Sequence, residues 1–251
     1  MLTSQRKKYL MDLLEKDRQL VAKKLSEELG VSEDTIRRDL REMAREGMLQ
    51  RVHGGALPLS PALVDFNQRE SIAADEKRAI GQAAAGMIVP GQIVFVDGGT
   101  TTAQLIRYLP ASLVATIVTH SPSIAMALGG HEHIEVILLG GRFYRHSLVA
   151  VGAATVNAIM QIRADCYFMG ASSLHPEAGL STGDYEEAAV KHAMSVQAGK
   201  TILLASSEKL DAVSPYQIMP ARALDTIVVA KNTEADLLAP YTAMQVEVVY
   251  A

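Results

Sequence analysis

Three short stretches near the start of the chain carry apolar side chains at helical spacing. Their apolar positions are Tyr9, Leu10, Leu13 and Leu14, then Val21, Ala22, Leu25 and Leu29, and finally Ile36, Leu40 and Met43. Positions that recur every three or four residues fall on one face of a helix. The second stretch stops at Gly30, which leaves only a short turn before the third. The pattern therefore predicts three helices around a small core, with a helix-turn-helix formed by the last two.

The third predicted helix carries a cationic face opposite its apolar stripe. Ser32 precedes the helix and can cap it through its hydroxyl, which leaves amides and partial positive charge free at the N-terminus. The side away from the stripe collects Arg37, Arg38, Arg41 and Arg45. A capped helix with one packing face and one basic face is typical of DNA recognition. Double-stranded DNA is therefore the first partner to consider.

A short wing follows this helix. Gly47 stops the helix, and residues 48–56 then contain a short alternating strand followed by a double-Gly turn. We interpret the unit as a winged helix-turn-helix; the alternative is a structural three-helix unit whose arginines only face water. The order of cap, turn, apolar stripe and wing favours DNA binding. The candidate DNA contacts are Ser32, Thr35, Arg37, Arg38, Arg41, Arg51 and His53. Among them, Arg38 is the strongest candidate for a base reader, and the last two are assigned to the DNA backbone or minor groove.

Beyond the wing, β-rich apolar runs alternate with helical segments. The runs 93–96, 115–118, 134–139, 166–169, 201–204, 226–229 and 246–249 are interpreted as buried strands. Such alternation predicts a largely parallel sheet with helices on both faces. Pro58 and Pro61 interrupt helical structure before it, and Asp75 can cap a helix that runs to Val89. We therefore expect a winged helix-turn-helix domain over 3–58, a linker over 59–74 and an α/β domain over 75–251.

The charge of the chain divides unevenly between these domains. Residues 1–55 carry 12 Lys and Arg against 10 Asp and Glu, and the remainder carry 12 against 18. The overall acidity therefore belongs to the larger domain and does not argue against DNA binding. A net charge of +2 on the first domain is modest, so that one subunit is expected to bind DNA weakly and with strong salt dependence. A homo-oligomer, a dimer or tetramer, would place two recognition helices on one operator.

Several other classes of protein are disfavoured. No apolar run approaches the roughly 20 residues that a membrane helix needs, and no secretory signal begins the chain, so we expect a cytoplasmic protein without a membrane partner. Cys166 is the only cysteine, which excludes an internal disulfide and a cysteine-rich zinc module. His131 and His133 suggest a metal site, but no convincing ligand set accompanies them. We expect neither a metal nor another cofactor.

Motifs spread along the chain resemble one family. Residues 35–40, Thr-Ile-Arg-Arg-Asp-Leu, followed by residues 51–56, Arg-Val-His-Gly-Gly-Ala, are similar to the N-terminal signature of the DeoR family of bacterial transcriptional regulators. The resemblance continues through 66–69, 76–77, 97–101 and 139–141. It implies a DNA-binding domain joined to an effector domain similar to the sugar-phosphate isomerase fold. It further implies a repressor of carbohydrate-metabolism genes that is controlled by a phosphorylated sugar or related metabolite.

Ligands of a parallel sheet bind at the carboxyl ends of its strands, so the loops there contain the candidate effector contacts. The first loop holds Asp97, Gly98, Gly99, Thr100 and Thr101. Its glycines let the backbone approach an anion, and its hydroxyls and a helix N-terminus can donate to it. Composition alone describes an ordinary tight turn with a threonine cap equally well. The family resemblance favours phosphate or sugar binding.

Two further strand ends supply additional candidates. Thr119 and Ser121 flank His120, where relatives usually have Asn, and this histidine could add positive charge near a phosphate. Gly141 permits close approach of a ligand. Arg142 next to it either binds an anion in bidentate fashion or remains a solvated surface group.

Two lysines complete the candidate effector site. Lys191 matches a family position one helical turn after Glu187, so the two form a surface ion pair or face the site together. Asp184 has capping-box spacing and is expected to begin their helix. Lys209 is retained in a motif in which relatives commonly show Asp-x-x-Lys, and Ser206 replaces the aspartate.

An enzyme is the alternative interpretation of the second domain. Asp97, Glu187, Lys191 and Lys209 could supply acid and base groups for isomerisation of a sugar phosphate. None of them has a spacing that demands catalysis, and a fold does not establish chemistry. We therefore expect a DNA-binding regulator without catalytic residues.

Overall fold

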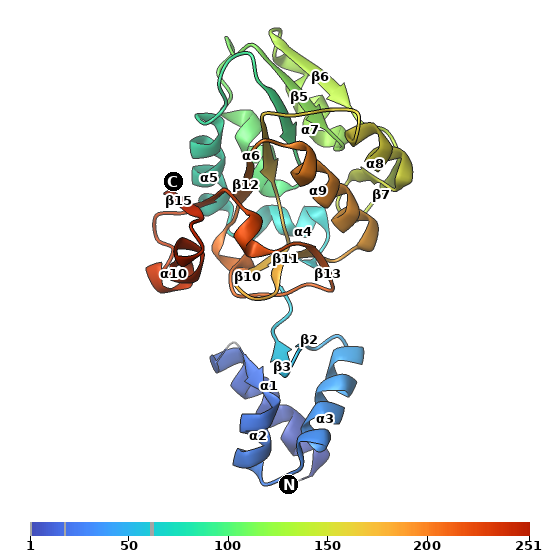
Figure 1. Ribbon diagram of the computed structural model, residues 1–251, viewed down its shortest axis with the longest axis vertical. Helices are drawn as coiled ribbons and strands as arrows, with labels where there is room; N and C mark the ends of the chain where they lie inside the picture. The colour runs from blue at the N-terminus through green and yellow to red at the C-terminus, as the bar shows by residue number, and fades with distance from the viewer. Residues whose placement is uncertain (1, 18, 61–62) are drawn as a thin grey trace.

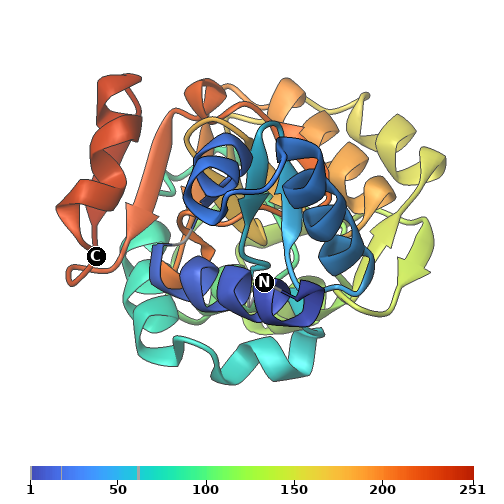
Figure 2. The same cartoon turned by 90° about the horizontal axis from the view of Figure 1, so that it is seen from below.

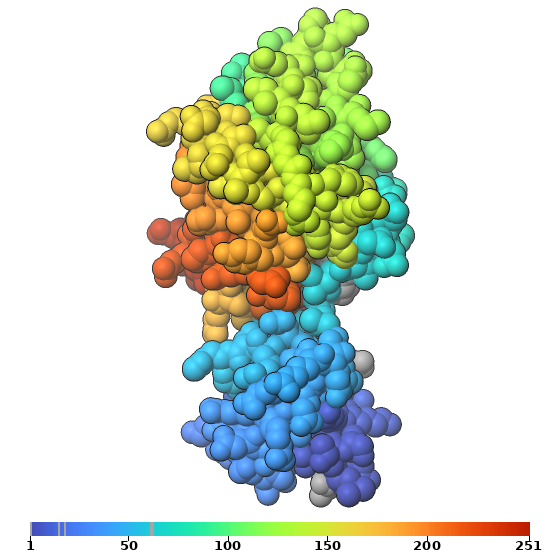
Figure 3. Space-filling model, turned by 90° about the vertical axis from the view of Figure 1, so that its right-hand side faces the viewer, coloured from blue at the N-terminus to red at the C-terminus, as the bar shows by residue number. Residues whose placement is uncertain are grey.

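The computed structural model describes residues 2–17, 19–60 and 63–251, and it shows a small N-terminal domain at one end of a larger α/β domain (Figure 1). Figure 2, seen from below, shows the smaller domain in front of the larger one and within its outline. The space-filling view in Figure 3 shows the same arrangement as two joined lobes. Among the described residues, no helix is long and apolar enough to cross a membrane.

The N-terminal domain is a winged helix-turn-helix. Its helices are α1 (Thr3–Asp17), α2 (Ala22–Leu29) and α3 (Glu33–Arg45), and its strands are β1 (Leu20–Val21), β2 (Gln50–Val52) and β3 (Gly55–Leu57). The strands form an antiparallel sheet in the order β1-β3-β2. The core is built from the predicted apolar positions, including Leu10, Leu14, Leu25, Ile36, Leu40 and Met43. The predicted helices and wing are confirmed, but Val21 lies in β1 and is exposed, not in the second helix.

A close backbone contact holds the wing to the helices. A Cβ atom on Gly55 would lie 1.7 Å from the backbone oxygen of Leu20. Only glycine lets β1 and β3 approach this closely, because any side chain at this position would push the two strands apart. Since β1 leads directly into α2, this contact fixes the position of the wing relative to the helix-turn-helix.

A buried ion pair joins α1 to α3. Arg6 donates from Nη2 to Oδ1 of Asp39 at 3.2 Å, and both side chains are almost completely buried. Asp39 lies within the basic run of α3, but its carboxylate faces the core. The acidic residue of this run therefore does not reduce the positive charge on the outer face of the helix.

The larger domain is built on a seven-stranded parallel sheet. Its strands, in sheet order, are β15 (Glu247–Tyr250), β14 (Thr226–Val229), β12 (Thr201–Leu204), β9 (Cys166–Met169), β4 (Ile93–Val96), β5 (Ala115–Thr119) and β6 (Ile134–Leu138). All neighbouring pairs are parallel. All seven predicted strands are present; β5 and β6 differ from the predicted range by one residue at one end, and β15 is shifted by one residue at both ends.

Helices cover both faces of this sheet. One face packs against α5 (Ala74–Ala85), α6 (Thr100–Arg107) and α7 (Pro122–Ala127), and the other against α8 (Ala153–Ile159), α9 (Tyr185–Gln197) and α10 (Ala235–Ala243). The predicted cap of α5 is wrong. The N-cap residue is Ala73, in a left-handed conformation at φ 48°, and Asp75 lies in the first turn, where it pairs with Arg78. The helix also ends at Ala85 and does not reach Val89.

Shorter elements surround the sheet and were not predicted. They are the hairpin β7 (Arg142–Tyr144) and β8 (Val149–Val151), the antiparallel sheet of β10 (Ser173–His175), β11 (Gly179–Thr182) and β13 (Tyr216–Met219), and the short helices α4 (Phe66–Ser71), η2 (Leu128–Gly130), η3 (Ser207–Lys209) and η4 (Ala221–Ala223). Helix α4 lies inside the stretch 59–74 that was expected to be a linker. In the same stretch, Leu59 forms a β-bridge with Val213. Pro61, one of the two prolines of the linker prediction, lies outside the described residues.

Candidate functional sites

The N-terminus of α3 is capped as predicted. The Ser32 hydroxyl accepts a hydrogen bond from the backbone N–H of Thr35 at 3.2 Å, and the two side-chain oxygens lie 2.8 Å apart. Both residues therefore stabilise the first turn of the helix, as expected of an N-cap.

Four of the predicted DNA contacts lie together. Arg37 and Arg41 of α3 and Arg51 and His53 of the wing line one shallow groove, and all four side chains are exposed. Arg37 is partly neutralised, because its Nη2 donates to Oε1 of Glu33 at 2.7 Å. A groove with this lining presents positive charge from the helix and the wing together.

Arg38 lies outside the groove lining but is exposed on the same helix. Within the part of the chain that the structure describes, no carboxylate lies within ion-pair distance of Arg38, in contrast to its neighbour Arg37. The sequence could not separate the two arginines. The structure leaves Arg38 with the freer guanidinium.

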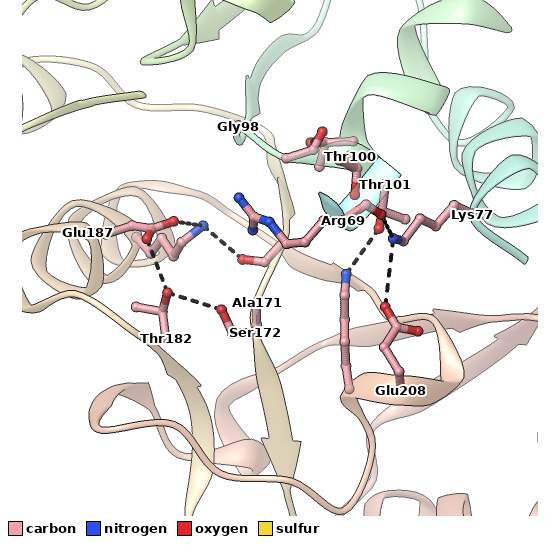
Figure 4. Close-up of a pocket in the computed structure, with 15 residues that line it drawn as sticks. Arg69, Lys77, Gly98, Thr100, Thr101, Ala171, Ser172, Thr182, Glu187 and Glu208 are labelled. Carbon is pink, nitrogen blue, oxygen red and sulfur yellow. Dashed lines mark hydrogen bonds and ion pairs between the residues drawn. The ribbon is translucent and has the colours of Figure 1, made fainter. Parts of the chain in front are cut away.

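A second candidate site lies at the carboxyl ends of β4, β9 and β12, where a cavity opens (Figure 4). Its lining consists of Arg69, Lys77, Gly98, Gly99, Thr100, Thr101, Thr102, Gly170, Ala171, Ser172, Thr182, Glu187, Lys191, Glu208 and Lys209. The lining thus combines four cationic side chains with two carboxylates and several hydroxyls. Six of the ten predicted effector residues are among them: Gly98, Gly99, Thr100, Thr101, Lys191 and Lys209.

Helix α6 directs its N-terminus at this cavity. Gly99 is its N-cap residue, at φ 149°, and no side chain caps the first turn. The first amides of a helix have no partner within the helix, and together they attract an anion. Thr100 and Thr101 add their side chains to the lining.

Two lysines approach the cavity from the side of α5 and η3. Lys209 donates from Nζ to the hydroxyl of Thr101 at 3.0 Å, and burial lowers its pKa to about 8. Lys77 donates from Nζ to the backbone oxygen of Arg69 at 2.6 Å and lies 3.8 Å from Oε1 of Glu208. Burial also lowers the pKa of Lys77. The contacts of both ammonium groups thus do not fully replace the hydration that each group loses on burial.

Arg69 extends its guanidinium into the middle of the cavity (Figure 4). Its Nη2 donates to the hydroxyl of Ser147 at 3.4 Å, and its Nε is buried with no hydrogen-bond partner among the described residues. Burial lowers the pKa of this arginine. Neither Arg69 nor Lys77 was predicted as a site residue, although both lie in stretches that carry the family resemblance, 66–69 and 76–77.

Asp97 does not line the cavity, contrary to expectation. It is fully buried; Oδ2 accepts from the backbone N–H of Gly170 at 2.8 Å and from Nζ of Lys191, and Oδ1 lies 2.8 Å from Nε2 of His120. Burial opposes its ionisation, but Lys191 and His120 outweigh burial and hold the pKa of this carboxyl well below its ordinary value. Asp97 therefore positions Lys191. His120 is held behind it, with Nδ1 2.8 Å from the backbone oxygen of Ala150.

The pair of Glu187 and Lys191 is buried and faces the cavity, so it is not a surface ion pair. Nζ of Lys191 lies 3.4 Å from Oε1 of Glu187, and Oε2 accepts hydrogen bonds from the hydroxyls of Ser147 and Thr182, both at 3.2 Å. Burial lowers the pKa of Lys191, but Asp97 and Glu187 outweigh it and raise the value. Asp184 caps α9 as predicted, accepting from the backbone N–H of Glu187 at 2.9 Å.

Three further predicted residues lie away from the cavity lining. Thr119 is buried and accepts from the backbone N–H of Ser121 at 3.1 Å, whereas the Ser121 hydroxyl caps α7. A Cβ on Gly141 would lie 2.0 Å from Oγ1 of Thr155, so this glycine permits close packing inside the domain. Each of the three therefore has a structural task at its strand end.

Arg142 and Ser206 also have local partners. Nε of Arg142 donates to Oε2 of Glu186 at 3.0 Å, and both side chains are exposed, which agrees with the interpretation of Arg142 as a surface group. The Ser206 hydroxyl donates to Oε1 of Glu208 at 2.8 Å. The carboxylate of this loop is thus supplied by Glu208 and not by position 206, and it lies within ion-pair distance of Lys77, at 3.8 Å, and not of Lys209.

Metal binding finds no support in the described ranges, where no group of three His, Cys, Asp or Glu side chains is arranged to hold an ion. Cys166 is buried, and burial raises the pKa of its thiol to about 11. This cysteine is thus a small core residue.

Two family models match the chain. The model described as DeoR-like helix-turn-helix domain matches residues 6–61, and that described as DeoR C terminal sensor domain matches residues 72–231. The HTH-type transcriptional regulator GlpR of Haloferax volcanii is 34% identical over 227 residues, which cover 90% of this chain and 89% of that protein. The glycerol-3-phosphate regulon repressor of Escherichia coli is 30% identical over 207 residues, 82% of either chain.

Solved structures give more distant similarities. The full-length sorbitol operon regulator SorC from Klebsiella pneumoniae aligns over 94% of this chain and 98% of that chain, with 16% identity and a TM-score of 0.41. Ribose 5-phosphate isomerase from Methanocaldococcus jannaschii aligns over 54% of both chains, with 17% identity and a TM-score of 0.40.

Proposed function

The chain belongs to the DeoR family of transcriptional regulators, and we propose that it is a repressor that leaves its operator when a phosphorylated sugar or polyol occupies the cavity of the larger domain. The DNA-binding domain and the sensor domain are those of the family. The direction of regulation and the chemical class of the effector are the proposal.

The excess of positive charge in the cavity is the observation that carries the effector class. Four cationic side chains line it against the carboxylates of Glu187 and Glu208. Lys209 and Arg69 have no carboxylate within ion-pair distance among the described residues, and burial lowers the pKa of both. A buried cation without a counter-charge is costly, and an anion that enters the cavity removes this cost. The free amides at the start of α6 favour the same ligand.

The polar groups across the cavity suit the uncharged part of such a ligand. We assign the phosphate to Gly98, Gly99, Thr100, Thr101 and Lys209, with Arg69 and Lys77 beside them. Lys191 and the carboxylate of Glu187 lie across the cavity with the hydroxyls of Ser172 and Thr182. These groups can exchange hydrogen bonds with the hydroxyls of a sugar or polyol. The proposed effector is therefore anionic at one end and hydroxylated at the other.

We propose that the domain binds this ligand without turning it over. An acid–base catalyst must reach the proton that it transfers. Asp97 is enclosed behind the loop with its oxygens already bonded, and the Glu187 carboxylate is held by Lys191 and two hydroxyls. Incubation with ribose 5-phosphate or fructose 6-phosphate should leave the sugar phosphate unchanged, and isomerisation at a rate abolished by Lys191→Ala would contradict this part of the proposal.

On DNA, we propose that α3 enters the major groove and that the wing contacts the backbone or minor groove. Arg38 is assigned to a base edge, and Arg37, Arg41, Arg51 and His53 to the phosphates that border it. A homo-oligomer, a dimer or tetramer, would place paired recognition helices on one operator. A regulator of this kind shares a compartment with its DNA, and we propose the cytoplasm.

The first test is a thermal-shift panel of inorganic phosphate, glycerol 3-phosphate, ribose 5-phosphate and fructose 1-phosphate, each paired with its unphosphorylated counterpart where one exists. A ligand of the folded state at about 100 times its Kd stabilises by about 2.7 kcal/mol. We expect stabilisation by phosphorylated compounds only. Lys209→Gln should reduce it at the same ligand concentration, and Arg142→Gln, a charge removed outside the cavity, should not. The proposed effector class would be overturned if the unphosphorylated compounds stabilised the protein equally well. It would also be overturned if no compound of the panel stabilised it.

The second test addresses the direction of regulation. Duplexes selected from a random-sequence pool by the wild-type protein supply an operator, and the stabilising compound is then added to the complex. Release of the duplex is the expected result. Unchanged or tighter binding in the presence of that compound would contradict ligand-relieved repression.

A further inference from the structure

One side chain of the cavity comes from the segment that joins the two domains. Arg69 belongs to α4, and only residues 58–65 separate this helix from the last strand of the wing. Every other lining residue lies at position 77 or beyond. The cavity is therefore completed by the stretch of chain that leads to the DNA-binding domain.

The joining segment touches the cavity at two places. The hydroxyl of Ser60 donates to the backbone oxygen of Ser172, which itself lines the cavity. Farther along, the backbone N–H of Phe66 donates to the oxygen of His146 at 3.0 Å, and Lys77 holds the backbone oxygen of Arg69 at 2.6 Å. The segment is thus attached by a few hydrogen bonds, by the β-bridge of Leu59 with Val213 and by the buried ring of Phe66.

The side chain of Arg69 is held less firmly than the backbone around it. Its guanidinium carbon lies 5.9 Å from the centroid of the Phe66 ring on the same short helix, and the bond to Ser147, at 3.4 Å, is long. Nε is buried without a hydrogen-bond partner among the described residues. An anion in the cavity would offer this fork the bidentate partner that it lacks.

Building on the proposed function, we propose that Arg69 is the residue through which an anion in the cavity acts on the DNA-binding domain. The anion binds Arg69 and the α6 N-terminus together, which ties α4 to the sheet and restricts where residues 58–65 can place the wing. A ligand shifts a conformational equilibrium only by interactions that differ between the two states. A contact between the anion and the joining segment is present in one placement of the DNA-binding domain and not in the other. Contacts between the anion and the rest of the larger domain are the same in both. Lys209, on η3, makes contacts of the second kind.

The test compares Arg69→Gln with Lys209→Gln, two variants that each remove one cation from the same cavity. Glycerol 3-phosphate and inorganic phosphate are the probes, with Kd measured by calorimetry and DNA affinity measured on the selected duplex at saturating probe. Wild-type DNA affinity is expected to fall about 5- to 150-fold, the usual range of allosteric coupling. Lys209→Gln should need more probe but show the same fall at saturation. Arg69→Gln should bind the probe and show less than about a twofold fall, because the coupling contact is gone.

Hydrogen exchange gives a second readout that does not require DNA. Saturating phosphate should slow amide exchange in residues 57–72 of the wild type and of Lys209→Gln, but not of Arg69→Gln. Arg69→Lys keeps the charge without the fork and should restore phosphate affinity more than it restores the slowing. A cooperative melting transition without phosphate, at or above the wild-type temperature, confirms that each variant folds.

The outcomes separate the two proposals. If neither probe binds the wild type, the effector class is wrong and this inference falls with it. If the probes bind and release DNA from Arg69→Gln as they do from the wild type, only the coupling role of Arg69 is overturned.

Discussion

Arg38 on α3 and Lys209 beside the cavity are both cations without an ion-pair partner in the described ranges, but their surroundings are opposite. Arg38 is exposed, whereas Lys209 is buried and burial lowers its pKa to about 8. Water solvates the exposed charge at little cost, and that charge stays available to a long polyanion that approaches from solvent. The buried charge is costly until a small anion reaches it. Burial, more than residue type, thus determines which anion each region can recognise.

The same contrast applies to screening by salt. Exposed charges more than about 8–10 Å apart are largely screened at physiological ionic strength, whereas buried charges are screened much less. Binding at the face of α3 should therefore weaken steeply with added salt, as expected for displacement of counterions from DNA. Binding in the cavity should change far less.

The largest effect is expected when a buried charge of the larger domain loses its counter-charge. Asp97→Asn leaves Lys191 buried without its closest counter-charge, and removal of one partner of a buried pair costs about 3–5 kcal/mol. Denaturant unfolding of the full chain should show this loss in the larger domain. Asp184→Asn, at a half-buried helix cap where asparagine can accept the same hydrogen bond, is the control and should cost much less.

The pH dependence of stability tests the same group. Because the pKa of Asp97 is held below its ordinary value of 3.8, its ionised form stabilises the folded state fully above that pH, and the stabilisation is lost as the pH falls further. The variant should lack this part of the acid dependence. An equal acid dependence in variant and wild type would show that Asp97 is not the charge that holds Lys191.

Lys209→Gln should have the next largest effect, on ligand binding. A hydrogen bond to a charged group contributes about 1.5–3 kcal/mol, so phosphate affinity should fall roughly 10- to 150-fold. Since the pKa of Lys209 is lowered to about 8, the wild-type affinity for glycerol 3-phosphate should also decline as the pH rises from 7 to 9. Calorimetry across this range should find the variant much less dependent on pH. A decline of the same size in the variant would assign the titration to another group.

Arg38→Ala tests the exposed side of the comparison. Loss of a base contact costs about 1–3 kcal/mol, which corresponds to a roughly 5- to 150-fold loss of DNA affinity. The melting temperature and phosphate binding should not change, because the side chain is exposed and belongs to the N-terminal domain, whereas the cavity lies in the larger domain. Arg37→Ala is the matched control, and its effect should be smaller since Glu33 already engages that guanidinium. Unchanged DNA affinity in Arg38→Ala would remove the assignment.

The smallest effect is expected at the exposed ion pair of Arg142 and Glu186. Exposed ion pairs contribute little to stability, because water solvates both partners and salt screens them. Arg142→Ala should therefore melt like the wild type and bind phosphate with the same affinity. A loss of phosphate affinity in this variant would show that Arg142 contributes to the effector site. It would also show that exposed charges take part in binding the small anion.

The fold was predictable from the sequence where one periodicity dominates. Stripes such as Ile36, Leu40 and Met43 identify helices of the first domain, and fully apolar runs such as 166–169 identify strands of a sheet covered on both faces. Strands such as β10 and β13 were missed because they mix polar and apolar residues over three or four positions, which gives neither an apolar run nor a period. Val21 was assigned to a helix because its spacing fits one, although it pairs in a sheet.

The cavity was predictable only in part. The loop after β4 is visible in the sequence because glycines and hydroxyl residues directly follow a strand. Strand ends alone do not show to which side a loop turns, and this is why Thr119 and Gly141 lie elsewhere. Arg69 and Lys77 come from helices that precede the sheet, so only the folded chain brings them to the cavity. The depth of Asp97 likewise follows from packing that no local pattern encodes.

Gly55 has a consequence for genetics. Its missing side chain lets β1 and β3 meet, and this contact sets where the wing stands relative to α3. A screen of living cells for mutants that no longer occupy the operator should therefore recover codon 55 repeatedly, with almost any replacement. Such alleles would resemble lesions in a nucleotide-reading residue, although the position itself has no side chain to offer DNA.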